Sequence, residues 1–349
     1  MHRAIGERPL AETRVSSDLA LELYEDMVRS RLFDERAVSL QRRGWMSGYP
    51  PFRGQEASQV GAAHALAGSD WLVPTYRSNA MQLVRGVPMA DILLFRRGRP
   101  EFASGRESNV FPQAISIASQ LPHAVGLGMA AARGDGSDAV CCYFGDGATS
   151  EGDFHEALTF AGVFDAPVVF FCENNRWAIS TPRPRQTASE TIAQKATAYG
   201  FEGVRVDGND PIATYEVVSD ALESARAGDP ILVESLTYRQ GPHTTSDDPS
   251  RYRTDEDLPA WRTADPLERF ERMLREHDVL ADDLAESIRA DAEAEIETAI
   301  ETADSSPEPG PTAVFDSVFA DRPPRISAQR EWLQEFLERR EPDDLETGR

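Results

Sequence analysis

Two polar stretches that each follow an apolar segment carry the residue types of a metal-phosphate site. The apolar run from Val140 to Phe144 ends on Gly145-Asp146-Gly147, and the run from Val168 to Cys172 ends on Glu173-Asn174-Asn175. Carboxylate and amide oxygens are ligands that Mg2+ takes, usually together with substrate phosphates. Glycines let backbone N–H groups approach a phosphate closely. The pattern therefore predicts that Asp146 and Asn175 contribute to a Mg2+-diphosphate site.

Such a site requires two parallel strands whose carboxyl ends meet at one edge of a sheet. A helix expected over residues 153–163 joins the two apolar runs, so they can pair in parallel and bring Asp146 and Asn175 together where open α/β sheets bind ligands. Ser150 and Asp153 have capping-box spacing, which predicts that the helix begins directly after the Gly-Asp-Gly turn. Either motif alone is common at strand ends, but their pairing is much rarer by chance.

Strands and helices alternate over about 100 central residues, which is typical of an α/β fold with a doubly wound, mostly parallel sheet and helices on both faces. Further strands are expected at 71–77, 203–206 and 230–236, and helices at 19–44, 55–67, 78–95, 122–132, 189–199, 212–227, 266–277 and 280–302. We therefore expect a tail (1–18), an α/β domain with helical extensions (19–304), and a proline-rich linker with a C-terminal helical arm (305–349).

The composition excludes several classes of protein. The formal charge of −23 disfavours binding to nucleic acid, whose phosphates require clustered Lys and Arg. No apolar run approaches the roughly 20 residues that cross a bilayer, and the polar N-terminal tail lacks the apolar core of a signal peptide. A cytoplasmic protein without membrane contact is expected. Cys141, Cys142 and Cys172 all lie in expected strands and are interpreted as core residues.

The basic residues are almost all arginine. Lys195 is the only lysine among 36 basic residues, and the chain has 59 acidic residues. This composition resembles that of proteins from salt-loving organisms, in which screening removes the self-repulsion of a high net charge. We expect an acidic surface adapted to salt.

Other polar segments could serve an anionic ligand. The pair Tyr76-Arg77 offers a phenol and an arginine fork that match phosphate oxygens. Segment 96–108 holds several arginines among glycines, although a solvated loop is the simpler interpretation. The loop 239–253 contains His243, which could act as acid, base or donor near neutral pH. From composition alone His243 is a solvated loop histidine, and Gly54-Gln55-Glu56 is a helix cap.

Together these motifs resemble the alpha subunits of the decarboxylating first component of 2-oxo acid dehydrogenase complexes. The nearest resemblance is to bacterial-type pyruvate dehydrogenase and to the branched-chain enzyme, over residues from about 19 to 340. Gly-Asp-Gly followed by Asn-Asn is the signature of thiamine diphosphate enzymes. The matching segments are 54–59, 74–77, 141–154, 173–181 and 241–249.

The resemblance implies a Mg2+ site and a diphosphate site. Asp146, the side chain of Asn175 and the main-chain oxygen of Trp177 would bind Mg2+. Trp177 stands where Tyr or Phe is usual, which a main-chain ligand tolerates. The diphosphate would be contacted by Gly147 and Ala148 and bound by Tyr76, Arg77 and Arg239.

The resemblance also implies residues at the reactive end of the cofactor. Ile117 would bend thiamine diphosphate, and His243 would line the mouth of the active site as the catalytic residue that assists reductive acylation of the lipoyl group. Asp247, Tyr252 and Arg253 would hold the His243 loop in shape. Thr244 stands where mitochondrial relatives carry a phosphorylated serine, so control by a kinase is not expected.

The implied reaction is the oxidative decarboxylation of a 2-oxo acid with acyl transfer to a lipoyl group. The thiamine diphosphate cofactor takes up the electrons released with CO2. Its deprotonation needs a glutamate beside the aminopyrimidine, for which the sequence offers no candidate; in this family it lies on a separate beta subunit. We expect a heterotetramer of two alpha and two beta subunits, the lipoyl domain of the transacylase core as a further partner, and no turnover by this chain alone.

The sequence leaves the substrate open. Pyruvate and branched-chain 2-oxo acids fit the resemblance, and so does acetoin, because the alpha subunit of acetoin dehydrogenase is a close alternative. A different class of protein, a non-catalytic Mg-nucleotide-binding module, would use the same strand, Gly-Asp-Gly turn and helix for another phosphate.

Overall fold

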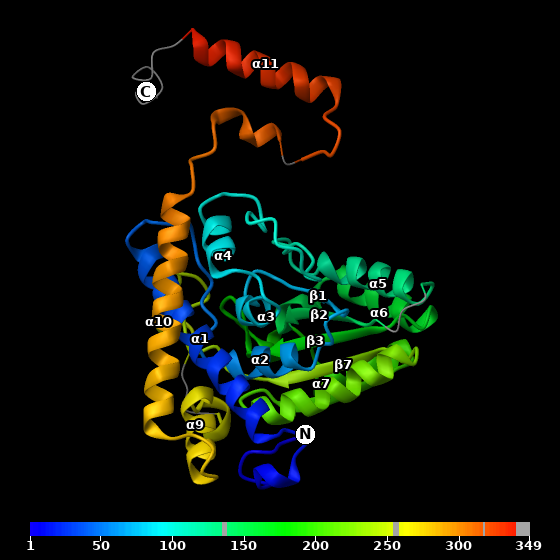
Figure 1. Cartoon of the computed structure of the whole chain (residues 1–349). Coiled ribbons are helices and arrows are strands. Elements are labelled where there is room, and N and C mark those ends of the chain that lie inside the picture. Colours follow the sequence, from blue (N-terminus) through cyan, green and yellow to red (C-terminus); the bar gives the residue numbers. More distant parts are fainter. Residues whose placement is uncertain (135–137, 254–257, 317, 340–349) are drawn as a thin grey trace.

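The core of the fold is a five-stranded sheet with the strand order β1-β2-β3-β7-β6. The computed structural model describes residues 1–134, 138–253, 258–316 and 318–339. All neighbouring strands of this sheet pair in parallel, which confirms the predicted fold class (Figure 1). Gly145 lies opposite Glu173, so the two motifs end at the same edge. The strands are β1 (Trp71–Val73), β2 (Val140–Gly145), β3 (Val168–Asn174), β6 (Glu202–Asp207) and β7 (Ile231–Leu236).

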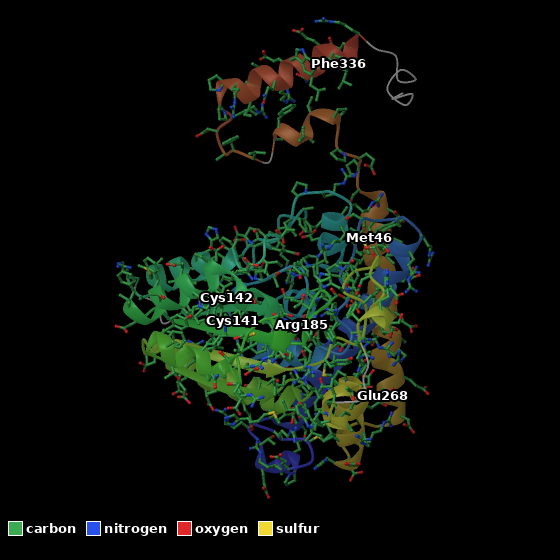
Figure 2. The ribbon with its side chains drawn as sticks, turned by 180° about the vertical axis from the view of Figure 1, so that it is seen from behind. Met46, Cys141, Cys142, Arg185, Glu268 and Phe336 are labelled. Atoms are coloured by element: carbon green, nitrogen blue, oxygen red, sulfur yellow. The ribbon has the colours of Figure 1, made fainter. Side chains whose placement is uncertain are left out.

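Helices cover both faces of the sheet. On one face lie α5 (Gln120–Ala131) and α6 (Gly152–Val163), and on the other α2 (Glu56–His64) and α7 (Pro211–Arg226) (Figure 1). Successive residues of a strand point to opposite faces. Cys142 accordingly packs in the cluster with α5 and α6, and Cys141 in the cluster with α2 and α7. Both thiols are buried and free in the middle of the sheet, as predicted (Figure 2).

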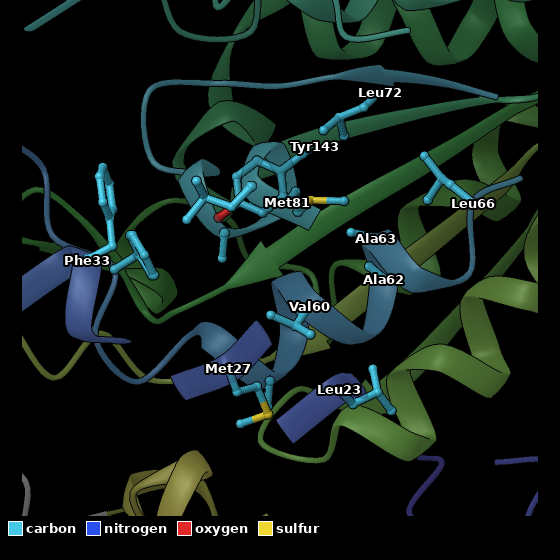
Figure 3. Packing of buried hydrophobic residues seen from close by; sticks show 14 of the residues in the cluster. Leu23, Met27, Phe33, Val60, Ala62, Ala63, Leu66, Leu72, Met81 and Tyr143 are labelled. Atoms are coloured by element: carbon cyan, nitrogen blue, oxygen red, sulfur yellow. The ribbon is translucent and has the colours of Figure 1, made fainter. Parts of the chain in front are cut away.

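A layer of helices packs against α2 from outside the sheet. It contains α1 (Ser17–Arg42), α9 (Pro266–Glu276) and α10 (Asp282–Ser305), of which α1 contacts the other two. Figure 3 shows Leu23 and Met27 of α1 close to Val60 of α2, within the cluster that also holds Tyr143 of β2. Apolar packing therefore continues from α1 through α2 to the sheet.

A buried polar network joins this helical layer to the segment before α2. Arg31 donates to Glu56 Oε1 at 2.6 Å and to Asp265 Oδ2 at 2.8 Å. Asp34 accepts from the Tyr49 hydroxyl at 2.9 Å. Burial, with the nearby charge of Glu56, raises the pKa of Asp34 to about 7. These contacts fix the chain around residues 49–56, just before α2.

One predicted helix is two helices. The stretch 78–95 forms α3 (Asn79–Val84) and α4 (Met89–Arg96). Gly86 between them has a φ of 80°, outside the right-handed helical region, and Pro88 caps α4. The prediction of a continuous helix was therefore wrong.

The predicted capping box is also absent. Ser150 ends a short 3-10 helix, η2 (Asp146–Ser150), and its hydroxyl donates to the main-chain oxygen of Gln186 at 3.4 Å. α6 begins only at Gly152, without a side-chain cap. The helix predicted at 189–199 is a shorter 3-10 helix, η4 (Ala193–Tyr199). The other predicted elements are present, with ends shifted by a few residues.

The remaining elements are short or lie near the C-terminus. η6 (Pro311–Phe315) and α11 (Pro324–Glu338) contact each other beyond the end of α10 (Figure 1). Residues 317 and 340–349 of the expected arm lie outside the described residues. No helix in the described part of the chain is long and apolar enough to cross a membrane. The short elements are η1 (Leu10–Glu12), β4 (Trp177–Ala178), β5 (Thr181–Pro182), η3 (Arg183–Arg185), η5 (Pro249–Arg251) and α8 (Ala260–Thr263).

The acidic composition predicts a salt-dependent stability. Arginines form surface ion pairs, such as Arg29 with Glu295 between α1 and α10, but 59 acidic residues exceed 36 basic ones. Because salt screens the remaining repulsion, we expect the midpoint of thermal unfolding to rise between low salt and molar KCl. Circular dichroism measures it, with sucrose of equal osmolality as the control. A midpoint that stays constant or falls in KCl would contradict the salt adaptation.

Candidate active site

A single cavity of about 530 Å³ at the carboxyl ends of β2 and β3 brings the predicted site residues together. Its wall is formed by the η2 turn, the segment after β3, the segments before α3 and α5, and the loop after β7. Every residue to which a site role was assigned from the sequence lines this cavity: Tyr76, Arg77, Ile117, Asp146, Gly147, Ala148, Asn175, Trp177, Arg239 and His243.

Asp146 presents an unused carboxylate oxygen. The side chain is 1% exposed, and burial raises its pKa to about 6. Oδ2 accepts from Gln186 Nε2 at 2.9 Å, whereas Oδ1 is buried and has no hydrogen-bond partner among the described residues. Leaving a buried carboxylate oxygen unpaired is costly. The environment of Oδ1 therefore suits a cation.

Asn175 and Trp177 supply the other two oxygens of the predicted metal site. Asn175 Oδ1 accepts from the Trp177 N–H at 3.2 Å, and the Trp177 main-chain oxygen accepts from Arg239 at 3.3 Å. Both bonds are long, and each oxygen has a second lone pair. The described residues hold no group of three or more His, Cys, Asp or Glu that could bind a metal. One carboxylate, one amide and one main-chain oxygen are a different kind of donor set, which suits Mg2+.

The residues at the start of α2 hold the residues of the cavity in place. The sequence alone had suggested that they cap the helix, and this interpretation was wrong. Gln55 makes no capping hydrogen bond; instead its Oε1 accepts from Asn175 Nδ2 at 2.7 Å. Gln59, one turn further on, donates to the Arg77 main-chain oxygen at 3.1 Å. These buried amides hold the orientation of Asn175 and the backbone of Arg77.

Gln186 is a site residue that sequence reasoning missed. It lies in the loop after β5, which has no helical or strand period, so nothing in the sequence separated it from its neighbours. The same loop region packs closely on the η2 turn, since a Cβ at Gly147 would lie 2.8 Å from Ala178 Cβ. Gln186 thus fixes the Asp146 carboxylate by donating to Oδ2, and leaves Oδ1 facing away from this contact. Because of the close packing, only glycine fits at position 147.

Three buried arginines face the cavity without a carboxylate partner. Arg77, Arg96 and Arg239 are 4%, 8% and 1% exposed, and none forms an ion pair within the described ranges. Their bonds go mainly to main-chain oxygens: Arg77 donates to Pro51 and His243, and Arg239 to Trp177 and Ile179. A buried charge without a counter-charge is unfavourable. In a chain of net charge −23, this arrangement indicates an anionic ligand.

His243 is neutral and not the solvated histidine that composition suggested. Arg77 Nη2 donates to His243 Nδ1 at 3.0 Å. Because arginine only donates, Nδ1 is the unprotonated nitrogen and Nε2 carries the proton. Burial, together with the charges of Arg77 and Arg239, lowers the pKa of His243 to about 3. The imidazole is thus a hydrogen-bond donor through Nε2.

The His243 loop is held by the residues expected to do so. Asp247 Oδ2 accepts from the His243 N–H at 2.7 Å and from the Tyr252 hydroxyl at 2.5 Å. Arg253 donates to the Gln240 main-chain oxygen at 2.8 Å. These contacts confirm the expected structural role of Asp247, Tyr252 and Arg253.

The rim of the cavity is apolar and exposed. Ile115, Ile117 and Ile179 line the cavity and are 59%, 41% and 57% exposed. A monomer gains nothing from exposing large apolar side chains around a polar cavity. The rim is therefore a candidate contact for a second chain or for the apolar part of a ligand.

Comparisons with known proteins agree with this geometry. The model of the dehydrogenase E1 component family matches residues 24–312. The chain is 45% identical over 339 residues to subunit alpha of 3-methyl-2-oxobutanoate dehydrogenase from Mycobacterium tuberculosis, covering 95% of this chain and 92% of that protein. It is 38% identical over 326 residues to subunit alpha of the pyruvate dehydrogenase E1 component from Staphylococcus aureus, covering 92% and 88%.

The geometry predicts that His243 does not titrate near neutrality. In 15N NMR spectra, the His243 ring should remain the neutral Nε2-H tautomer from pH 8 down to about pH 4. Since its folded pKa lies below 6.5, protonation favours the unfolded chain, and the stability linked to His243 should fall as the pH drops from about 6.5 toward 3. An Arg77→Met variant should raise the His243 pKa. A wild-type ring that titrates near pH 6.5 would contradict this assignment.

The contact of Gln186 with Asp146 predicts a role in metal and cofactor binding. Gln186→Ala should weaken Mg2+-dependent binding of thiamine diphosphate by roughly ten-fold or more, because partners of a metal ligand typically contribute this much. Isothermal titration calorimetry measures the change. The exposed Gln194, changed to Ala, is the matched control. Equal affinities for both variants would show that Gln186 does not position Asp146.

Proposed function

The chain belongs to the dehydrogenase E1 component family, the thiamine diphosphate-dependent components of 2-oxo acid dehydrogenases, and we propose that its cavity binds the diphosphate of that cofactor with Mg2+. The observation that carries the proposal is the combination of buried arginines without counter-charge and the unpaired Oδ1 of Asp146. The first suits an anion and the second a cation, and a metal diphosphate supplies both.

Individual residues receive the roles that their contacts support. Asp146, Asn175 and the Trp177 main-chain oxygen bind Mg2+. Diphosphate oxygens accept from Arg77, Arg239 and the Tyr76 hydroxyl, while the turn at Gly147 and Ala148 approaches the diphosphate with backbone N–H groups. Ile117, which lines the cavity, packs against the cofactor and helps to bend it. Bound thiamine diphosphate supplies the electron sink for the decarboxylation.

His243 acts in this proposal as a neutral donor. Its Nδ1 is occupied by Arg77, so Nε2-H is the group that can donate to a substrate or lipoyl group entering the cavity. The Asp247 contact fixes the loop backbone and therefore the ring position. His243 thus orients the acyl acceptor for reductive acylation without changing its own charge.

A beta subunit completes the site. Among the described residues, the only carboxylates that line the cavity are Asp146 and Glu151. Neither is available as the base beside the aminopyrimidine, because Asp146 binds the metal and Glu151 is an exposed residue before α6. The apolar rim of Ile115, Ile117 and Ile179 suits coverage by a second chain. We propose a heterotetramer of two alpha and two beta subunits, with residues 305–349 as an arm that contacts a partner.

The reaction is the oxidative decarboxylation of a 2-oxo acid with acyl transfer to a lipoyl group of a transacylase. The higher identity to the 3-methyl-2-oxobutanoate enzyme than to the pyruvate enzyme, 45% against 38%, favours a branched-chain substrate. Pyruvate is the second candidate, and acetoin is the alternative that lacks a carboxylate.

Changes at the metal site test the proposal. Asp146→Ala and Asn175→Ala should each weaken binding of thiamine diphosphate at least 100-fold in the presence of Mg2+, since each removes a metal ligand. Calorimetry with the alpha-beta complex measures the affinity, and the exposed Asp229, changed to Ala, is the control. MgATP, as the competing ligand class, should not bind. Intact thiamine diphosphate binding in both variants, or robust decarboxylation by the alpha chain alone, would overturn the assignment.

A further inference from the structure

Arg96 is a cavity residue to which neither the sequence motifs nor the proposed cofactor site gives a role. It is the last residue of α4 and lines the cavity, although it is only 8% exposed. From the sequence, the basic segment 96–108 could serve an anionic ligand or, more simply, form a solvated loop, and the solvated loop was wrong for this buried residue. A helix end therefore carries a guanidinium into the cavity wall.

The hydrogen bonds of Arg96 go to neutral groups, and the nearest acidic influence, Glu101, acts on it without forming an ion pair. Nη2 donates to the Tyr76 main-chain oxygen at 2.9 Å and to Gln113 Oε1 at 3.4 Å. Nε is buried without a partner, and the described residues place no carboxylate in an ion pair with Arg96. Glu101 accepts from the Gln113 N–H at 3.0 Å instead. A buried guanidinium with neutral partners and an unused N–H is suited to an anion from outside the chain.

The diphosphate already has other partners. Arg77 and Arg239 both contact His243, and Arg239 also donates to the main-chain oxygen of Trp177, a proposed Mg2+ ligand. Among the described residues Arg96 forms no hydrogen bond with His243 or with the η2 turn, and its bonds go to segments that precede α5. Its charge is thus additional to the pair of arginines that the proposed diphosphate site uses.

We propose that Arg96 binds the carboxylate of the 2-oxo acid substrate and makes the enzyme selective for a substrate that carries one. The inference rests on the proposed function and narrows it, because acetoin has no carboxylate to pair with Arg96. The interaction favours the bound substrate over the transition state, since the carboxylate leaves as uncharged CO2. Arg96 is therefore a specificity residue, whose loss raises KM and does not lower kcat.

The test compares Arg96→Gln, Arg96→Lys and a control in the alpha-beta complex loaded with thiamine diphosphate and Mg2+. Arg85→Gln is the matched control, because Arg85 also donates to main-chain oxygens (Leu66, Gly68 and Asp70) and does not line the cavity. For 3-methyl-2-oxobutanoate, Arg96→Gln should raise KM about ten-fold or more with kcat unchanged or higher, because a charge-assisted hydrogen bond is lost. Arg96→Lys should have a smaller effect and Arg85→Gln none.

Binding separates recognition of the carboxylate from the shape of the cavity. Calorimetry on the cofactor-free complex compares 3-methyl-2-oxobutanoate with 3-methyl-2-butanone, which has the same branched chain and ketone without a carboxylate. Wild type should bind the acid at least ten-fold more tightly than the ketone, and Arg96→Gln should lose this preference while its affinity for the ketone stays the same.

Distinct results would overturn the inference. An unchanged KM in Arg96→Gln, an equal loss of affinity for acid and ketone, or a ten-fold loss of thiamine diphosphate affinity with an unchanged KM would each assign Arg96 another role. If Arg96→Gln does not fold, Arg96→Lys must still raise KM and reduce the preference for the acid. A wild-type complex that uses acetoin and no 2-oxo acid would refute the proposed function itself, whereas turnover of 2-oxo acids with an unaltered Arg96→Gln variant would refute only this inference.

Discussion

The site depends on one constraint, the positive charge of buried arginines that line the cavity without a carboxylate partner. A buried guanidinium is stable only if its N–H groups are satisfied. Arg77 and Arg239 meet most of this requirement with main-chain oxygens of Pro51, Trp177 and Ile179, whereas Arg239 Nε is buried without a partner among the described residues. Carbonyl dipoles satisfy the hydrogen bonds but do not neutralise the charge. The arginines therefore hold the surrounding loops in place and at the same time keep the cavity positive, so that an anion completes the structure.

Contacts that lie well outside the cavity hold the residues of this site in place. Arg31 and Asp34 of α1 fix the segment around Tyr49 and Glu56 through buried hydrogen bonds. That segment leads into α2, where Gln55 orients Asn175. The apolar packing of α1 on α2 thus bears on the geometry of Asn175, the proposed metal ligand. Without the helical layer, the two strand ends would still meet, but the amide of Asn175 would lose the contact that sets its orientation.

The sequence was most informative where a periodic pattern and a special residue coincide. The apolar runs of β2 and β3 predicted a parallel pair, and its register placed Asp146 and Asn175 at one edge. Tyr76 and His243 were candidates from their side-chain chemistry, but only the resemblance assigned them, together with Arg239, to a site. Gln186 could not be recognised at all, and Arg96 was noted only as part of a basic segment for which a solvated loop was the simpler interpretation. Their environments are created by tertiary contacts: Gln186 by a non-periodic loop that packs on η2, and Arg96 by the break at Gly86 that reorients α4.

The charge of the cavity also bears on the proposal that a second chain supplies the base. The buried arginines suit the charged end of a cofactor, but their positive charge opposes the rise in pKa that burial gives a nearby carboxylate, as it does at Asp146, and so weakens such a group as a base. A base that must accept a proton is better placed at a distance from this cluster, beyond the apolar rim of Ile115, Ile117 and Ile179. A second subunit would meet this requirement if it covered the rim, excluded water and placed its own carboxylate away from Arg77 and Arg239. The proposed division of the diphosphate site and the base between two chains therefore agrees with the electrostatics of the cavity.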